Sequence, residues 1–281
     1  MPLLSAPLPR MAGRLTFMRS CQRSVSELKP GDLAVLGLPF EDVSAPHAGQ
    51  YLAPRAIRET SVYFGWHANP QFSHPFDIDD RKLIQTEGLY ERLSDLGDLS
   101  TEGGADPEEL VQHMVEAVAA KDACLILLGG TQTMVQKAYD ALGESCLVQM
   151  GGKKTNNKGY HIAPEVNSTG SRHAFFCEEL SPSEMLAEIE EWRKDDTPIF
   201  LHFDLSVFNS SLAVLSDSPR LGGCDLPAIA TLMSEIGRLP VAVVHVTGLN
   251  PTRFGMGVVK VGQRLIVTAL LPFIYSRLGF S

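Results

Sequence analysis

The sequence predicts an α/β protein with three layers, in which a mostly parallel sheet lies between two layers of helices. Short apolar segments alternate along the chain with segments of helical pattern, which is the order typical of such sheets. The 281 residues are 44% hydrophobic and 20% charged, a balance that supports one sizeable core, and no repeat or linker divides them. We therefore expect a single domain over residues 1–281, with residues 1–28 as an irregular N-terminal extension.

Six apolar runs predict the strands. Each run is rich in Leu, Val and Ile and ends at a loop that contains glycine or polar residues. The predicted strands are 33–38, 93–99, 124–130, 145–150, 198–203 and 241–246.

Capping residues predict where the main helices begin. Asp106, Ser181 and Asp225 each precede a helical pattern, and a proline follows each within two residues. The three predicted helices run over 107–121, from 182 to about 193, and from 226 to the glycine at 237. The apolar C-terminal segment predicts a final packed helix.

Charge and cysteine content limit the class of protein. The net charge of −9 argues against a nucleic-acid partner and an anionic membrane surface, and no apolar run reaches the ~18 residues that span a bilayer. The five cysteines are widely spaced without a CxxC pair, which indicates neither a zinc site nor a disulfide framework. We expect a cytoplasmic protein. Four arginines and no acid in the first 26 residues leave two interpretations of that end, a targeting segment or a disordered or edge-packed terminus.

The loops that follow the strands carry the functional information. In parallel sheets the ligand site lies outside the carboxyl ends of the strands. Here those ends read GLPFED, GGTQTM, MGGKKTNN, FDLSVFN and VTGLNP.

Together these loops resemble the ureohydrolase superfamily, which includes arginase, agmatinase and formimidoylglutamase. LGLPFEDVSAPHAGQYLAPRAIRE resembles the family's first strand and loop, and DLGD its second strand. LLGGTQTM, MGGKKTNN and FDLSVFN stand where the family has Gly-Gly-Asp-His-Ser, Asp-Ala-His-x-Asp and Asp-x-Asp-x-x-Asp-Pro. The resemblance covers nearly the whole chain and implies an arginase-like fold, in which two Mn²⁺ ions would share a hydroxide that attacks a guanidinium carbon.

The family's metal ligands are almost absent from the matching positions. These positions hold Thr131 and Gln132, then Gly151, Lys153 and Thr155, and finally Asp204, Ser206 and Asn209. Mn²⁺ prefers carboxylate and imidazole ligands, of which Asp204 is the one that remains. The ammonium group of Lys153, if it lay about 4 Å from a bound divalent ion, would repel that ion by roughly 8 kcal/mol at an effective dielectric of about 20. The resemblance therefore implies that this chain binds no metal and no other cofactor.

Two functions follow from this comparison. The first is a pseudoenzyme without hydrolase chemistry, which acts as a regulatory or structural subunit beside an active relative, or as a sensor of a small ligand. The alternative is an active hydrolase of a guanidine or amidine substrate, with a site rebuilt around Asp204, His173 and Lys153. The family's habit of assembly implies a homo-oligomer or a hetero-oligomer with an active relative. The candidate ligand-binding residues are Gln132, Lys153, Thr169, His173, Asp204 and Ser206, with His173 and Asp204 as vestigial catalytic candidates.

Several features keep two interpretations. Asp204 is either a lone general base or the ion-pair partner of Lys153. GGKKTNNKG is either an anion-binding loop or a flexible polar loop, and His202 is expected to be a satisfied core histidine. The family's substrate-gathering glutamate matches Ala228. Residues 173–197 leave room for one helix, which predicts a sheet one strand shorter than the family's.

Overall fold

Eight strands in the described part of the chain pair into one parallel sheet, as the alternating pattern predicts. The computed structural model describes residues 14–41, 48–65, 76–77, 82–84, 88–101, 104–151, 153–154, 160–161, 172–175, 181–193, 197–209, 211–212, 223–252 and 256–280. The strands of the sheet are β1 (Cys21–Gln22), β2 (Leu33–Leu38), β5 (Leu93–Asp98), β6 (Cys124–Gly129), β7 (Cys146–Met150), β10 (Arg172–Phe175), β11 (Ile199–Asp204) and β12 (Val241–Thr247). Two short antiparallel pairs, β3 (Phe76–Asp77) with β4 (Lys82–Leu83) and β8 (Lys153–Lys154) with β9 (Tyr160–His161), lie outside it.

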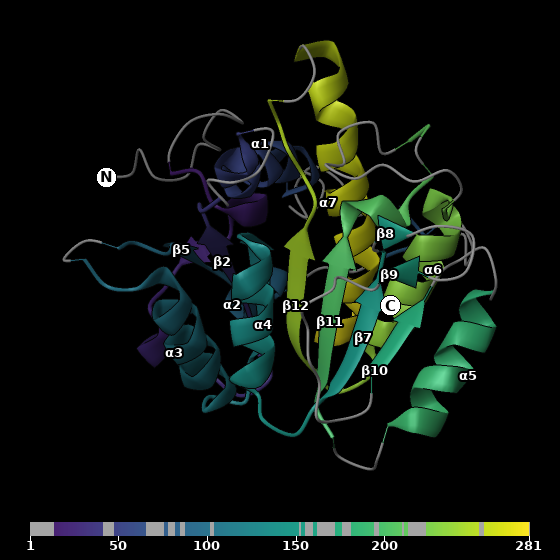
Figure 1. Cartoon of the computed structure of the whole chain (residues 1–281), viewed down its shortest axis with the longest axis horizontal. Coiled ribbons are helices and arrows are strands. Elements are labelled where there is room, and N and C mark those ends of the chain that lie inside the picture. The colour runs from purple at the N-terminus through teal and green to yellow at the C-terminus, as the bar shows by residue number, and fades with distance from the viewer. Residues whose placement is uncertain are drawn as a thin grey trace.

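The order of the strands is β1-β5-β2-β6-β12-β11-β7-β10 (Figure 1). β11 therefore lies between β12 and β7, although β12 is the last strand in the sequence. In this register Asp204 is opposite Thr247, and His202 is opposite both His245 and Gln149. The carboxyl ends of β6, β12, β11 and β7 thus meet at one edge of the sheet.

Helices cover both faces of the sheet (Figure 1). On one face α3 (Pro107–Ala119) and α4 (Gln132–Asp140) pack against Leu36, Leu127 and Phe200. The opposite face carries α1 (Ala53–Gly65), α5 (Pro182–Trp192), α6 (Leu226–Gly237) and α7 (Met256–Leu278), and the four-residue α2 (Leu89–Arg92) adjoins this layer. Single turns of 3₁₀ helix are η1 (Phe17–Arg19), η2 (Val25–Glu27), η3 (Gln50–Leu52) and η5 (Leu205–Val207). The predicted three-layer α/β fold is confirmed.

The six predicted strands and three capped helices are present within two residues of the expected bounds. Asp106 accepts a hydrogen bond from Glu108 N, Asp225 accepts one from Ala228 N, and Ser181 forms a reciprocal capping box with Glu184. Between β10 and β11 the described residues contain α5 and no strand, in agreement with the single helix expected there. The strand β10 itself was not predicted. It contains His173, which the sequence identifies only as a candidate ligand-binding residue.

The described end of the N-terminal segment is attached to the sheet. Phe17 and Met18 are fully buried, and Phe17 N donates a hydrogen bond of 2.6 Å to Asp95 Oδ2. β1 pairs with β5 and forms one margin of the sheet. Residues 1–13, which include Arg10, lie outside the described part of the chain.

Cysteines follow the prediction in the strands and depart from it in one loop. Cys124 and Cys146 are buried free thiols, and burial raises the pKa of Cys124 to about 11. Cys224 is disulfide-bonded to a partner outside the described residues, so the prediction of no disulfide is corrected here. Within the described residues we find no helix whose length and hydropathy suit a membrane span.

Candidate functional site

Asp204 ends β11 and lies at the centre of a small polar network. Its Oδ1 accepts a hydrogen bond of 2.8 Å from Ser206 N, and its Oδ2 accepts one of 2.9 Å from Thr247 Oγ1. The first contact caps η5, so the chain turns away from the sheet directly after the carboxylate. Both oxygens of this carboxylate are thereby engaged within its own loop and the neighbouring strand.

His202 extends the network into the core. Its Nε2 lies 2.8 Å from Thr247 Oγ1, and the threonine hydroxyl has only one hydrogen, which it donates to Asp204. His202 Nε2 is therefore the donor, which fixes the tautomer. Burial lowers the pKa of this fully enclosed ring more strongly than the negative charge of Asp204 raises it. The sequence predicts that His202 is a core histidine whose hydrogen bonds are satisfied, and the structure confirms this for its Nε2 atom.

His245 lies beside His202 on β12, with ring centroids 6.2 Å apart. Its Nε2 donates a hydrogen bond of 2.8 Å to the carbonyl oxygen of Gly129. Burial, followed by the neighbouring His202 ring, lowers the pKa of His245 to about 3. The Nδ1 atoms of both rings and Oε1 of Gln149 are buried and have no hydrogen-bond partner among the described residues. A row of three neutral polar side chains therefore crosses β7, β11 and β12 beneath Asp204.

Two glycines leave room for the Asp204 carboxylate and for the loop that follows it. Gly248 has φ +82°, and a Cβ at that position would lie 2.7 Å from both oxygens of the Asp204 side chain. Gly151 has φ +91°, and its Cβ would lie 2.9 Å from Asp204 O and from Val207 N. A side chain at residue 151 would therefore displace the loop after β11. The resemblance aligns this glycine with an aspartate ligand of the family.

The other predicted site residues are located only in part. Ser206 is buried next to Asp204, and Gln132 is the first residue of α4, which Thr131 caps through Met134 N. Lys153 belongs to β8 and His173 to β10, where β7 separates His173 from β11. The side chains of Gln132, Lys153 and His173, and all of Thr169, lie outside the described part of the structure. The ion pair between Lys153 and Asp204 thus stays a prediction.

Thr247 and His245 were not identified from the sequence. Both come from VAVVHVTG, which reads as a buried strand with a polar end. The feature that could have identified Thr247 is the parallel register of β11 and β12. Thr247 lies one residue beyond the predicted strand, and it is opposite Asp204 once β12 is placed beside β11. That placement depends on strand order and could not come from local pattern.

The described donors do not suit a pair of Mn²⁺ ions. Two manganese ions require several carboxylate and imidazole ligands around one point. Within the described residues no group of three His, Cys, Asp or Glu side chains is close enough to hold a metal ion. Among the residues that the structure describes, Asp204 is the one carboxylate at the carboxyl end of β11, and Ser206 follows it with a buried hydroxyl.

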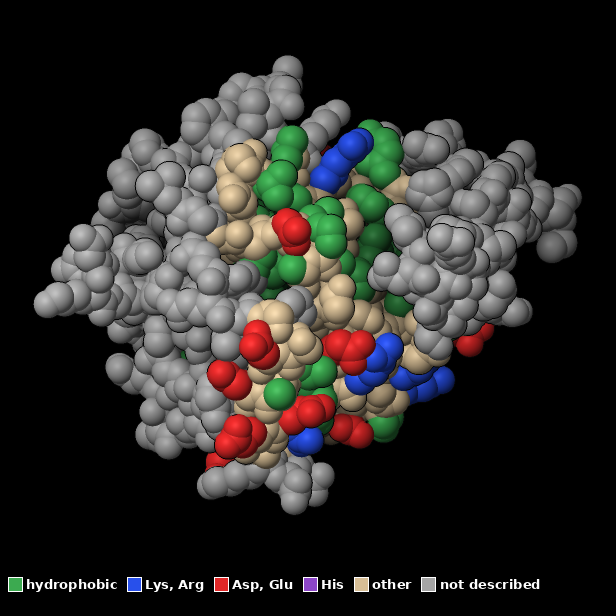
Figure 2. Space-filling model, turned by 90° about the vertical axis from the view of Figure 1, so that its right-hand side faces the viewer, with side chains coloured by type: hydrophobic (Ala, Val, Ile, Leu, Met, Phe, Trp, Pro, Cys, Tyr) green, Lys and Arg blue, Asp and Glu red, His purple; other side chains and the backbone are tan. Residues whose placement is uncertain are grey.

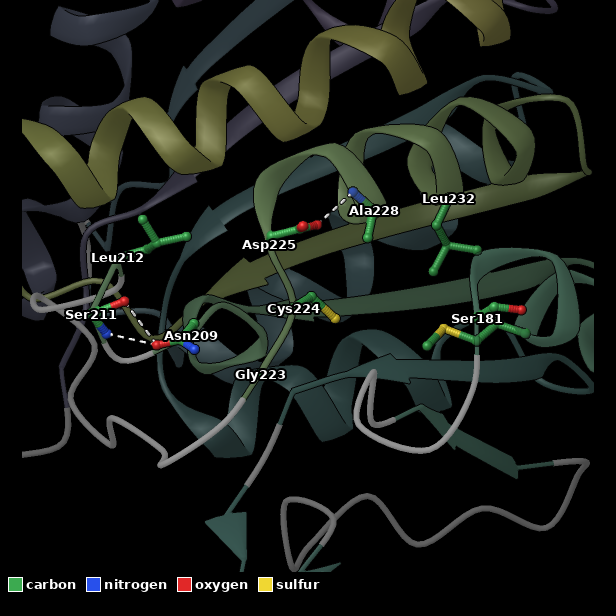
Figure 3. A pocket seen from close by; sticks show the side chains of 10 residues that line it. Ser181, Asn209, Ser211, Leu212, Gly223, Cys224, Asp225, Ala228 and Leu232 are labelled. Atoms are coloured by element: carbon green, nitrogen blue, oxygen red, sulfur yellow. Dashed lines mark hydrogen bonds between the residues drawn. The ribbon is translucent and has the colours of Figure 1, made fainter.

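A separate cavity of about 530 Å³ lies between the start of α5, the start of α6 and residues 209 and 211–212 (Figure 3). Its apolar lining comes from Met185, Leu212, Cys224, Ala228 and Leu232. Its polar lining comes from Ser181, Asn209, Ser211 and Asp225, and Gly223 completes it. Asp204 and Ser206 do not contribute to this lining.

Comparison with known proteins gives related folds and one family. The model of the arginase family matches residues 31–146. The chain is 21% identical over 224 residues to N(1)-aminopropylagmatine ureohydrolase of Thermococcus kodakarensis, covering 67% of this chain and 72% of that protein.

Solved structures extend the similarity over most of the chain. The proclavaminate amidino hydrolase from Streptomyces clavuligerus has a TM-score of 0.70 at 18% identity, covering 96% of this chain and 99% of that one. The agmatine ureohydrolase of Thermoplasma volcanium has a TM-score of 0.70 at 17% identity, covering 95% of each chain. Formimidoylglutamase from Bacillus subtilis gives 0.68 at 16%, covering 98% and 96%. At these identities the structures show a shared fold.

Proposed function

The chain is a divergent member of the ureohydrolase superfamily, and from that premise we propose that it is a pseudoenzyme. In this account it has lost the binuclear manganese site and the hydrolase reaction. It acts by binding, either as a regulatory or structural subunit beside an active relative or as a sensor of a small ligand.

The contacts of Asp204 carry the proposal. This side chain is the one carboxylate retained among the family's ligand positions, and its oxygens accept hydrogen bonds from Ser206 N and Thr247 Oγ1. A metal ion would compete with both donors and would leave the His202–Thr247 pair without its acceptor. Gly151 supports the same conclusion, since its neighbours leave no room for a carboxylate side chain.

The names of the relatives favour a second candidate function. They are called ureohydrolase, amidino hydrolase and formimidoylglutamase, which suggests hydrolysis of a guanidine or amidine. An active site of that kind would use Asp204 as general base together with His173 and Lys153. These three groups would have to converge within hydrogen-bond reach of one substrate atom.

Assembly and location belong to the same proposal. We propose an oligomer, either of this chain alone or with an active relative, and a cytoplasmic location. The buried free thiols Cys124 and Cys146 suit a reducing compartment, whereas the disulfide at Cys224 is the observation against it. Alkylation of free cysteines in freshly lysed cells, followed by mass mapping, tests the location. An alkylated Cys224 would support the cytoplasm, and an unlabelled, disulfide-bonded Cys224 would count against it.

A substrate panel tests the function. The purified protein is incubated with arginine, agmatine and N-formimidoylglutamate, with and without Mn²⁺, and release of urea or formamide is measured. The Thermoplasma volcanium agmatine ureohydrolase serves as the positive control. We expect no release above the protein-free blank. Turnover that Asp204→Asn abolishes and Asp106→Asn leaves unchanged would establish the hydrolase instead.

A further inference from the structure

The cavity between α5 and α6 has the build of a small-molecule site. Ligand pockets are typically lined by apolar side chains with a few convergent polar groups, and their volumes begin at about 300 Å³. Here the volume is about 530 Å³. Met185 and Leu232 are buried at its base, one from each helix, and Ala228 adds only a methyl group. The small side chain of Ala228, at the position of the family's glutamate, leaves this space open.

Polar groups stand at the rim of the cavity. Asp225 is exposed. Its Oδ1 accepts the hydrogen bond from Ala228 N, and its carboxylate carries a negative charge. Asn209 uses its Oδ1 to accept from Ser211 N and Ser211 Oγ at 3.0 and 2.9 Å. In Figure 3 the Asn209 amide nitrogen lies on the side of Cys224. The rim thus offers a carboxylate and an amide above an apolar base.

The charge of the rim selects the sign of a ligand. Among the described lining residues Asp225 has the one charged side chain. Glu184, Glu190 and Glu191 are exposed on the adjoining α5, and hydrogen bonds from Ser181 lower the pKa of Glu184. On this side of the molecule acidic side chains are interspersed with Lys and Arg as well as with apolar and uncharged ones (Figure 2). The charge that lines the cavity itself is therefore that of Asp225, which attracts a cation and repels an anion.

We propose that this cavity binds a small molecule that joins an apolar body, such as a phenyl or branched alkyl group, to a primary ammonium group. The apolar body lies against Met185, Ala228 and Leu232, and the ammonium donates to Asp225. The ligand needs no guanidinium and no metal, and it does not contact Asp204. This inference rests on the proposed function as a binding protein and gives its sensor form a site.

Methionine methyl signals report occupancy of this cavity directly. The full-length protein is labelled with ¹³C at the methionine methyl groups, and the Met185 signal is assigned with Met185→Leu. Phenethylamine is then titrated, followed by 2-phenylethanol and 3-phenylpropionate, which have similar bodies with neutral and anionic heads. We expect the amine to shift Met185 and to bind most tightly, with the carboxylate weakest. Met134, which packs on the opposite face of the sheet, should not shift.

Two pairs of variants separate charge from shape. Asp225→Asn keeps a good capping residue and removes the charge, so we expect about tenfold weaker binding of phenethylamine. Asp106→Asn makes the same change at the start of α3 and should leave binding unchanged. Ala228→Leu fills the cavity and should abolish the shift, whereas Ala230→Leu adds the same bulk to α6 outside the lining.

Three results would overturn the proposal: no shift of Met185 by the amine, equal affinity for the amine and the carboxylate, or undiminished binding to Asp225→Asn. Thermal unfolding of each variant shows whether it is folded before binding is scored. A negative binding result would not change the interpretation of the substrate panel, because a chain that neither hydrolyses substrates nor binds this ligand could still be a structural subunit. Hydrolysis in that panel, by contrast, would remove the proposed function while leaving the cavity result readable.

Discussion

Thr247 Oγ1 donates a hydrogen bond of 2.9 Å to Asp204 Oδ2 and so joins this carboxylate, at the end of β11, to the core of the sheet. The same hydroxyl accepts from His202 Nε2 at 2.8 Å. Asp204 therefore has a structural function that needs no metal. It caps η5 and anchors the buried histidine through one threonine.

Replacement of Thr247 by valine tests this function. The valine keeps the shape of the side chain but leaves His202 Nε2 without an acceptor and Asp204 Oδ2 without a donor. We expect a loss of about 1–3 kcal/mol in the free energy of unfolding, measured by urea denaturation. Thr247→Ser retains the hydroxyl and should preserve the ¹⁵N NMR signature of an Nε2-protonated His202. A valine variant as stable as the parent would show that this network contributes nothing.

Gly248 and Gly143 form a matched pair for the space around Asp204. Both have positive φ, +82° and +67°, but only Gly248 has a neighbour within 4 Å of an added Cβ. Gly143→Ala should cost about 1–2 kcal/mol, the price of a left-handed backbone for a residue with a Cβ. Gly248→Ala must also displace the Asp204 carboxylate, and we expect roughly 3 kcal/mol or more. Equal losses would mean that the carboxylate moves aside freely.

The buried histidines make stability depend on pH. Burial lowers the pKa of His245 to about 3, while in the unfolded chain it is about 6.5. Between these values the unfolded chain binds the extra proton, so the free energy of unfolding falls as the pH falls through 6.5. From pH 7 to pH 5 this histidine should account for a loss of about 2 kcal/mol.

His245→Gln keeps a donor for Gly129 O and removes the titrating ring. The variant should lose about 2 kcal/mol less than the parent between pH 7 and pH 5, as read from denaturation curves. His113→Gln, at an exposed position of α3, is the control and should follow the parent curve. A parallel profile for His245→Gln would contradict the assignment of a neutral buried ring.

The ion pair between Arg58 of α1 and Asp95 of β5 allows a test in the other half of the sheet. Arg58 lies buried in α1 and binds Asp95 through Nε and Nη2 at 2.8 and 2.9 Å, while its Nη1 contacts Asp98. Arg58→Met leaves the fully buried Asp95 without its guanidinium, and we expect a loss of about 3–5 kcal/mol. Arg55→Met, three residues away and exposed, should change stability by no more than about 0.5 kcal/mol. Similar losses for both variants would contradict this account of the pair.

Local pattern was sufficient for most of the fold. The apolar run of β2 and the capping residues Asp106 and Ser181 were identified within a residue or two, because strand burial and helix caps are encoded by neighbours in the chain. The strand β10 was missed since four residues, RHAF, are too few to show a period. It forms through pairing with β7, which is a contact distant in sequence.

The candidate site was predicted less completely for the same reason. Asp204 and Ser206 stand in one motif, and the sequence placed them correctly together. The partner of Asp204 is Thr247, which lies 43 residues further along and reaches it only through the order of β11 and β12. The disulfide at Cys224 likewise has no local signal.

The manganese content of the purified protein tests the proposed loss of the metal site most directly. The protein is incubated with excess Mn²⁺, desalted and analysed by elemental mass spectrometry, with the Thermoplasma volcanium agmatine ureohydrolase treated in parallel. One carboxylate with both oxygens already engaged should retain less than about 0.1 equivalent of manganese. Retention of one or two equivalents would contradict the account and would mean that Asp204 is a ligand in a working metal centre.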